Sequence, residues 1–311
     1  MLPFWSLAMN DSNFHFSLKE KSKPILKWAG GKTNLLPQLL KIFPVNFYRY
    51  IEPFIGGGAV FLSLTKKIPA IINDYNKEVF NLYMGILENP KEIIKNLDRY
   101  AKLYSEEFYY ELRKNIPSSN YEKIARTIFL NKTGFNGLYR QNLKGEFNVP
   151  FGKRDACPTL YEIENFLKVS ERLSSVEIFN EDFENVIDKS GQGDFIYCDP
   201  PYEPLSQTSS FNSYNSIGFN QQEQIRLYDS CVRASRRGAC IIISNSNSKF
   251  ILDLYKDFEI RKLFAKRAIN SNGKKRGEIE EVLIFICEPN LRKFYFNEVK
   301  HYSSNELELS M

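Results

Sequence analysis

Short apolar runs and longer stretches with helical spacing alternate along most of this chain. The short runs are rich in β-branched and aromatic residues and are bounded by Gly, Pro, Asn or Asp, a pattern that predicts strands. They lie near residues 50–52, 70–74, 175–179, 195–198, 239–244, 258–264 and 282–287. Apolar residues at helical spacing fill the stretches 160–173, 221–236 and 250–255. This alternation predicts an α/β fold with a Rossmann-like sheet.

The alternation stops between Tyr75 and about Lys132. Four helical stretches follow one another there without a strand, at 79–87, 93–104, 108–112 and 121–130. Such an interruption is typical of a subdomain inserted into a larger domain. We therefore expect four parts: an N-terminal extension at 1–22, a main domain at 23–75 and 158–288, an inserted subdomain at 76–157, and a C-terminal tail at 289–311.

Two glycine-rich segments precede the insertion. The first, Lys27–Lys32, fails as a Walker A loop because Leu26 stands where its first glycine belongs. The second, Glu52–Gly58, follows a predicted strand and precedes a helix predicted from Val60 to Lys66. It lacks the G-x-G-x-x-G pattern of a dinucleotide site, but such a turn lets backbone approach a nucleoside closely.

The next predicted strand ends at Asp74, 18 residues after Gly56. In Rossmann-type sites an acid at this place bonds ribose hydroxyls. The plain alternative is a helix cap. The glycine turn upstream favours the ribose interpretation.

The stretch Asp199-Pro-Pro-Tyr202 ends the apolar run Phe195–Cys198. Proline has no N–H and fixes φ, so the strand must stop there in a rigid corner. Open α/β sheets place their ligands at the carboxyl ends of strands. The corner offers the Asp199 carboxylate and the Pro200 carbonyl as acceptors for an exocyclic amine, and the Tyr202 ring as a stacking face. A simple Pro-Pro turn is the bland alternative.

A basic segment closes the insertion. Between Asn131 and Arg154 five basic residues stand against one acid, Glu146, with aromatic and amide side chains interleaved. Two short strands flanking Leu143–Glu146 are predicted to form a β-hairpin. Arginine and asparagine bond base edges, and aromatic rings stack between bases. The hairpin is therefore a candidate nucleic-acid surface, with an ordinary solvated hairpin as the alternative.

Two further loops follow. The polar segment 203–218 is long for its position, which is typical of an active-site lid or of a plain surface loop. The segment 265–281 carries basic residues able to contact phosphates, although a plain exposed turn explains it almost as well.

Composition restricts the chemistry. The net charge of +5 over 311 residues permits nucleic acid as a partner without requiring it. Five cysteines without C-x-x-C spacing and two histidines near opposite ends argue against a zinc site or a disulfide framework and fit a reducing cytoplasm. No apolar run is long enough to cross a membrane. Residues for hydride transfer, phosphoryl transfer or triad hydrolysis are missing. Methyl transfer from S-adenosylmethionine needs few protein groups, because its sulfonium is already activated.

Several motifs, in one order, resemble the Dam-type DNA adenine-N6 methyltransferase family across residues 23–288. They are Lys27–Lys32, Glu52–Gly58, Asn73-Asp74, Gly134–Gly152, Asp199–Tyr202, Leu205-Ser206 and Ile243–Asn245. The resemblance implies a site-specific enzyme that methylates N6 of a flipped adenine in double-stranded DNA, usually in GATC, with S-adenosylmethionine as cofactor and no metal. It also implies that the insertion recognises the target. We further expect a cytoplasmic protein that is monomeric in solution.

The resemblance also assigns residues. Cofactor contacts would come from Trp28, Lys32, Phe54, Gly56, Gly58, Asp74 (ribose), Asp182 and Phe183 (adenine), and Asp199 nearby. The flipped base would meet Asp199, Pro200 and Tyr202. DNA contacts would come from Lys27, Phe135, Asn136, Leu138, Arg140 and Asn142, with Arg140 reading a guanine.

Alternatives stay open at this point. Amine chemistry alone does not exclude methylation of cytosine N4 or of adenine in RNA, although the hairpin disfavours both. A DNA-binding regulator that has lost turnover, or a nucleotide-binding structural protein, would share parts of the pattern. A solitary role and a restriction-modification role are equally compatible with the sequence.

Overall fold

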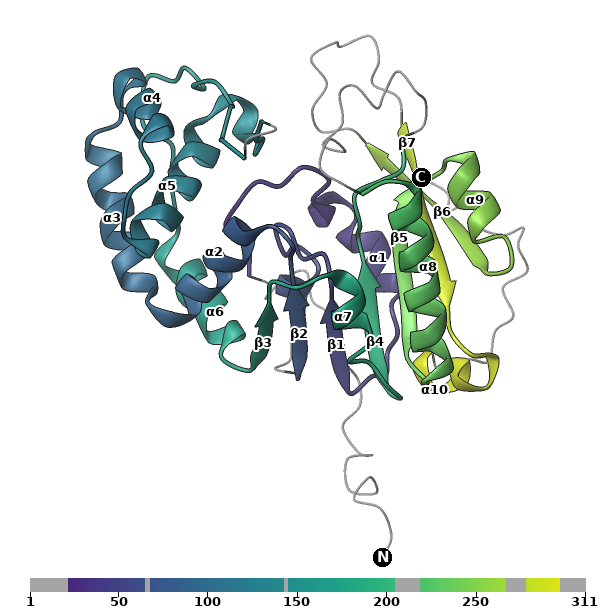
Figure 1. Cartoon of the computed structure of the whole chain (residues 1–311). Helices are drawn as coiled ribbons and strands as arrows, with labels where there is room; N and C mark the ends of the chain where they lie inside the picture. The colour runs from purple at the N-terminus through teal and green to yellow at the C-terminus, as the bar shows by residue number, and fades with distance from the viewer. Residues whose placement is uncertain (1–21, 65–67, 143–144, 205–218, 267–277, 297–311) are drawn as a thin grey trace, which may run out of the picture.

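A twisted sheet with helices on both faces forms the main body of the protein (Figure 1). The computed structural model describes residues 22–64, 68–142, 145–204, 219–266 and 278–296. The strands are β1 (Arg49–Glu52), β2 (Ala70–Asn73), β3 (Val176–Phe179), β4 (Asp194–Cys198), β5 (Cys240–Ser246), β6 (Glu259–Lys266) and β7 (Glu278–Ile286). Their order in the sheet is β3-β2-β1-β4-β5-β7-β6.

The direction of the strands matches the predicted α/β class. Strands β1 to β5 pair in parallel, so their carboxyl ends meet at one edge of the sheet. Strand β7 pairs antiparallel with both β5 and β6. Chain order reverses at β1 and β4, which are neighbours in the sheet. Ligands of open α/β sheets bind at such a switch point. The Rossmann-like fold predicted from the sequence is confirmed.

The helices that the structure describes cover both faces of this sheet and form a lobe beside it (Figure 1). They are α1 (Leu36–Ile42), α2 (Lys77–Glu88), α3 (Pro90–Lys102), α4 (Glu106–Lys114), α5 (Asn120–Thr133), α6 (Ile163–Leu173), α7 (Phe183–Ile187), α8 (Gln221–Arg236), α9 (Lys249–Leu254) and α10 (Arg292–Phe296). Among the residues described, no helix is long and apolar enough to span a bilayer.

Alternate residues of the central strands serve different cores, as the two-residue period of a strand requires. Tyr50 and Phe195 belong to the core that includes α1, α2 and the inserted helices. Ile51 and Ile196 face α7 and α8. Because both faces are covered, the strands read as continuous apolar runs in the sequence.

The insertion between β2 and β3 forms a helical lobe beside the sheet (Figure 1). Helices α2 to α5 follow one another there without a named strand. The lobe shares one continuous core with the sheet, because Ile86, Phe129 and Phe166 pack in the same apolar cluster as Tyr50. The lobe is therefore held against the sheet by buried side chains.

Two local expectations differ from the structure, and a third falls outside the residues that it describes. The helix predicted from Val60 to Lys66 is a turn followed by the short 3-10 helix η3 (Phe61–Ser63). The hairpin strands are reduced to two isolated bridges, Gly134 with Phe151 and Gln141 with Phe147. Between them the Asn148 N–H donates to the Arg140 carbonyl oxygen at 3.0 Å. Segments 205–218 and 267–277, which held most of the expected lid and basic loop, lie outside the described residues.

The start of the expected C-terminal tail is also folded. The 3-10 helix η7 (Pro289–Leu291) leads into α10, whose Tyr295 is completely buried. The Tyr295 hydroxyl accepts from the Gly193 N–H at 3.0 Å and lies 2.6 Å from the Gly238 carbonyl oxygen. Tyr295, with Phe294 and Phe296 packed on the core beside it, thus fixes this segment below the sheet.

Candidate active site at the carboxyl edge of the sheet

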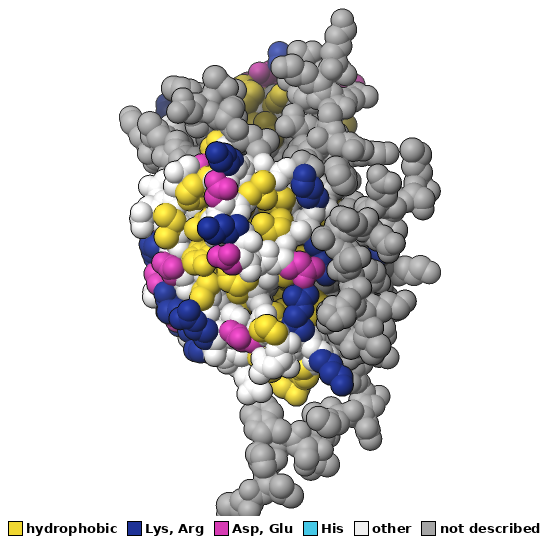
Figure 2. Space-filling view, turned by 90° about the vertical axis from the view of Figure 1, so that its right-hand side faces the viewer, with side chains coloured by type: hydrophobic (Ala, Val, Ile, Leu, Met, Phe, Trp, Pro, Cys, Tyr) yellow, Lys and Arg dark blue, Asp and Glu magenta, His cyan; other side chains and the backbone are white. Residues whose placement is uncertain are grey.

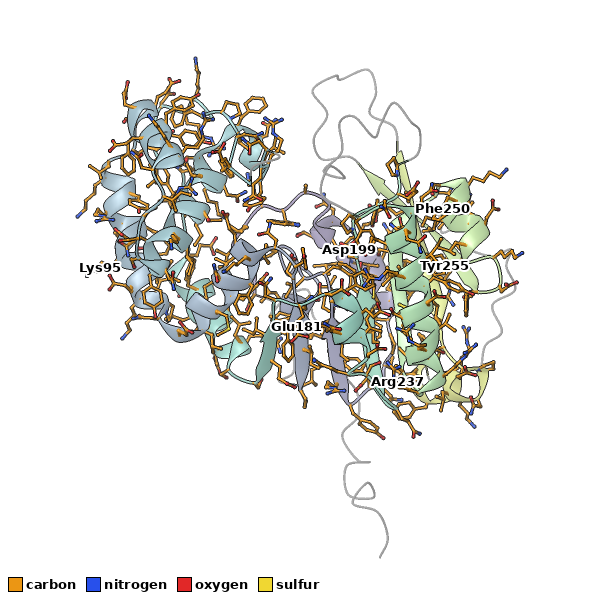
Figure 3. The ribbon with its side chains drawn as sticks, viewed as in Figure 1. Lys95, Glu181, Asp199, Arg237, Phe250 and Tyr255 are labelled. Carbon is orange, nitrogen blue, oxygen red and sulfur yellow. The ribbon has the colours of Figure 1, made fainter. Side chains whose placement is uncertain are left out.

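The corner after β4 faces a buried lysine from the first glycine-rich segment. Asp199 Oδ2 lies 2.7 Å from Lys32 Nζ. The Lys32 side chain is 3% exposed and also donates to the Gly30 carbonyl oxygen at 2.7 Å. Figure 3 shows Asp199 at the end of the sheet that faces the helical lobe. The structure therefore brings together two segments that are 167 residues apart in the sequence.

Burial and charge act in opposite directions on Asp199. Desolvation raises the pKa of its carboxyl, and the Lys32 ammonium lowers that pKa. Glu52 lies behind this pair, accepting from the Tyr50 hydroxyl at 2.8 Å and from the Phe61 N–H at 3.1 Å. Its burial raises the pKa of Glu52 well above its ordinary value. Among the residues described, the site is therefore acidic and largely buried, and the Lys32 ammonium lies against its carboxylates.

Tyr202, which follows β4, is held by a side chain of β7, two strands away in the sheet. Its hydroxyl donates to Glu281 Oε2 at 2.8 Å, and Lys32 Nζ lies 4.9 Å from its ring centroid. Glu281 belongs to β7, which comes late in the chain, and sequence reasoning missed it. The only local signal for Glu281 in the sequence was an acidic residue next to an apolar run. Its contact with Tyr202 depends on the pairing of β7 with β5.

Polar side chains brace the Pro-Pro corner. Gln224 of α8 donates from Nε2 to the Pro201 carbonyl oxygen at 3.0 Å and accepts from Asn245 Nδ2 at 3.1 Å. Asn245 Oδ1 accepts from the Glu203 N–H at 3.3 Å. Asn245 belongs to a motif noted in the sequence, whereas Gln224 was missed. A glutamine on the buried face of a helix was its only signal.

The glycine turn contacts both Asp74 and Trp28. Asp74 accepts from the Gly56 N–H at 2.8 Å and from the Asn76 N–H at 2.9 Å. Burial raises the pKa of Asp74 to about 6, although these two hydrogen bonds act to lower that pKa. Gly56 has φ 46°, and a Cβ there would lie 2.6 Å from Trp28 Nε1. Only glycine fits this turn without moving the indole.

Asp182 and Phe183 lie at the start of α7. Asp182 caps the helix by accepting from the Glu184 N–H at 2.9 Å, and it pairs with Arg226 at 2.8 Å. Phe183 is buried against Phe54, with ring centroids 5.4 Å apart. This aromatic pair joins the glycine turn to α7.

The predicted DNA-contacting residues gather at the end of α5. Phe135 is 51% exposed, and Asn136 follows it with φ 56°. Arg140 is exposed and donates from Nε to Asn148 Oδ1 at 2.7 Å. Asn142 donates from Nδ2 to Glu146 Oε2 at 2.8 Å.

Lys27 and Leu138 differ in their surroundings. Asn131 brackets Lys27 through hydrogen bonds to its N–H (2.8 Å) and its carbonyl oxygen (2.9 Å), and Asn131 also donates to the Gly137 carbonyl oxygen at 3.1 Å. The exposed Lys27 side chain therefore lies beside the predicted DNA surface. Leu138 is half-buried and packs on the core, so part of its role is structural.

In the part of the chain that the structure describes, no three His, Cys, Asp or Glu side chains gather closely enough to hold a metal ion.

A parallel sheet with an acidic, aromatic corner beside a glycine turn is typical of amine methyltransferases. The family described as D12 class N6 adenine-specific DNA methyltransferase matches residues 28–269. The chain belongs to this family. It is thus an adenine-specific DNA methyltransferase, a class of enzyme that takes its methyl group from S-adenosylmethionine.

Several curated relatives are similar over most of the chain. The type II methyltransferase M1.LlaDCHI of Lactococcus lactis subsp. cremoris is 39% identical over 270 residues, covering 84% of this chain and 94% of that protein. The type II methyltransferase M.MjaIII of Methanocaldococcus jannaschii is 42% identical over 284 residues, covering 84% and 98%. The DNA adenine methylase of Escherichia coli K12 is 31% identical over 268 residues, covering 85% and 95%.

Proposed function

We propose that this enzyme methylates N6 of an adenine that has been flipped out of duplex DNA, within the sequence GATC. The observation that carries this proposal is the 2.7 Å contact between Lys32 and Asp199. It joins the first glycine-rich segment to the amine-binding corner, so a cofactor and a base held by these two parts would meet. Base extrusion is the only way to bring an adenine amine from a stacked duplex into such a corner.

The residues present suit S-adenosylmethionine. Within the Glu52–Gly58 turn, the three glycines at 56–58 offer backbone without side chains, and Asp74 offers carboxylate oxygens to ribose hydroxyls. Phe54 and Phe183 offer aromatic faces beside Asp182 for the cofactor's adenine. We assign the remaining cofactor contacts to Trp28, Lys32, Gly56, Gly58 and, at its edge, Asp199. When bound, the cofactor supplies an electrophilic methyl group.

Asp199 and the Pro200 carbonyl would accept the two N–H bonds of the adenine amine. Its lone pair is normally delocalised into the purine, so it is a weak nucleophile. Accepting both N–H bonds favours a pyramidal nitrogen whose lone pair points at the methyl group. These acceptors strengthen as positive charge develops on nitrogen, so they stabilise the transition state. The Tyr202 ring would stack on the base and offset part of the few kcal/mol that extrusion costs. The proton then leaves to Asp199 or to solvent.

We assign target recognition to the inserted subdomain, residues 76–157. Phe135, Asn136, Arg140 and Asn142 lie on its exposed end, with Lys27 beside them and Leu138 beneath. The side of the molecule turned away from the lobe mixes hydrophobic, acidic and basic side chains, with Lys and Arg gathered toward one lower edge (Figure 2). The assignment to the insertion therefore depends on the exposed residues named above. We further propose that the enzyme acts as a cytoplasmic monomer.

Labelled S-adenosylmethionine, purified protein and short duplexes test the proposal. We expect label in N6-methyladenine for a duplex that contains GATC, and little for each of its single-base variants. Enzymatic digestion of the product identifies the modified base. Label in N4-methylcytosine would refute the adenine assignment. Equal label in the variant duplexes would refute GATC, and transfer to stacked and mismatched adenines at equal rates would argue against extrusion.

A further inference from the structure

Glu281 of β7 contacts the active-site corner from a strand that carries none of the residues assigned above. Glu281 pairs in register with Ser246, at the carboxyl end of β5, and so reaches the edge where Asp199 lies. Its side chain is 12% exposed. Its Oε2 accepts from the Tyr202 hydroxyl at 2.8 Å. A buried carboxylate is costly unless it is hydrogen-bonded or paired with a cation, and Tyr202 and Lys32 provide these contacts to Glu281.

The second contact of Glu281 is with Lys32. Lys32 Nζ lies 2.7 Å from Asp199 Oδ2 and 3.9 Å from Glu281 Oε2. One buried ammonium therefore serves two carboxylates. Because the ammonium is shared, it stabilises the ionised form of Asp199 less than it would in an isolated pair.

We propose that Glu281 is a positioning residue for methyl transfer: it fixes the Tyr202 ring through the phenol hydroxyl and divides the charge of Lys32 between itself and Asp199. This inference rests on the proposed function. Glu281 does not touch the base. It sets the plane on which the base stacks, and it adds negative charge near a nitrogen that becomes positive during transfer. The bland alternative is an acid that only stabilises the fold.

The charged and titratable groups around Asp199 allow these two roles to be separated. They are Lys32, Tyr202, Glu281, Glu52 of β1 and Tyr197 of β4. Burial raises the pKa of both Asp199 and Glu281. Two like charges in one site oppose each other's ionisation. Removing the Glu281 charge therefore eases ionisation of Asp199 and moves the acid limb of the rate profile to lower pH.

The test compares Glu281→Gln with Glu259→Gln. Glu259, on neighbouring β6, bonds Arg261 and Arg292 away from the site and controls for loss of a strand carboxylate. For the wild type and for each variant, kcat, the KM for DNA and the pH profile of the rate are measured with a GATC duplex and S-adenosylmethionine. Misplacing a reacting group by about 1 Å costs on the order of a hundredfold. We expect Glu281→Gln to lower kcat about tenfold to a hundredfold with little change in the KM for DNA, and to shift the acid limb downward. Glu259→Gln should leave both unchanged.

A second variant guards against misfolding. Tyr202→Phe keeps the ring and removes the hydroxyl that donates to Glu281, so it should also lower kcat. The loss of kcat in the double variant Glu281→Gln/Tyr202→Phe should be smaller than the product of the two single losses. Unchanged kcat and pH profile in Glu281→Gln, or equal losses in Glu281→Gln and Glu259→Gln, would overturn the positioning role while adenine methylation by the wild type stands. A wild-type enzyme without adenine methylation would overturn the proposed function itself.

Discussion

The indole of Trp28 stacks on the ring of Tyr139, with centroids 4.7 Å apart and planes inclined by 30°. Trp28 also packs against the glycine turn, and the Tyr139 hydroxyl donates to Glu78 Oε2 at 2.8 Å. Glu78 lies in the first turn of α2, four residues after Asp74. The inserted subdomain and the proposed cofactor turn are thus connected through the two stacked rings, and the hydrogen bond holds Tyr139 to α2 within the subdomain.

Replacing Tyr139 by Ala should weaken both fold and cofactor binding. The ring is 4% exposed, and removing a buried aromatic side chain typically costs about 3–5 kcal/mol. We expect a loss of this size in urea unfolding, together with weaker binding of S-adenosylhomocysteine by calorimetry, since Trp28 loses its support. Tyr139→Phe keeps the ring and should bind nearly as the wild type does. Undiminished cofactor affinity in Tyr139→Ala would contradict the connection.

Replacing Asp199 by Ala should abolish methyl transfer while DNA binding stays largely intact. Removal of one preorganised group at a developing charge typically costs about a hundredfold to a thousandfold in kcat, and here the same carboxylate also pairs with Lys32. Single-turnover assays measure the transfer, and gel-shift titrations measure DNA binding. Turnover comparable to wild type would remove Asp199 from the mechanism.

Replacing Arg140 by Ala should relax site choice or weaken specific binding by about 1–3 kcal/mol. The Asn148 side chain holds the guanidinium at 2.7 Å, so Asn148→Ala should produce a smaller effect in the same direction. Competition binding across single-base variants of GATC measures both. If Arg140→Ala keeps the wild-type preference at every position, a guanine-reading role for Arg140 is wrong.

Much of the sheet was predictable because each central strand is locally apolar. β4 and β5 are buried along their whole length, and the parts Phe195–Cys198 and Cys240–Ile243 read as continuous hydrophobic runs. The corner after β4 was predictable because Pro200 and Pro201 stop a strand by covalent geometry. The position of Asp74 and Asp199 at the ends of their strands was therefore predictable before any contact was known.

Long-range partners were not predictable in this way. The contacts of Glu281 with Tyr202 and of Gln224 with Pro201 depend on which strands and helices become neighbours. The burial of Tyr295 was not predicted because a short aromatic run, Phe294–Phe296, set among polar residues gives no periodic signal. The helix expected after the glycine turn failed because the chain there bends to fit Trp28 and Tyr83, with Gly56 and Gly58 at positive φ.

The ionisation of Asp74 gives a last prediction, on the pH dependence of cofactor binding. Its pKa is raised to about 6 by burial, so the carboxyl gains a proton as the pH falls through that value. A protonated carboxyl accepts ribose hydroxyls more weakly, so we expect the Kd of S-adenosylhomocysteine to rise below about pH 6, approaching tenfold per pH unit. Asp74→Asn should bind more weakly at pH 8, by about 1.5–3 kcal/mol, because a hydrogen bond to a charged group is lost. Its Kd should stay flat between pH 5 and 8, as measured by calorimetry. A wild-type Kd that is equally flat would show that Asp74 does not hold the ribose.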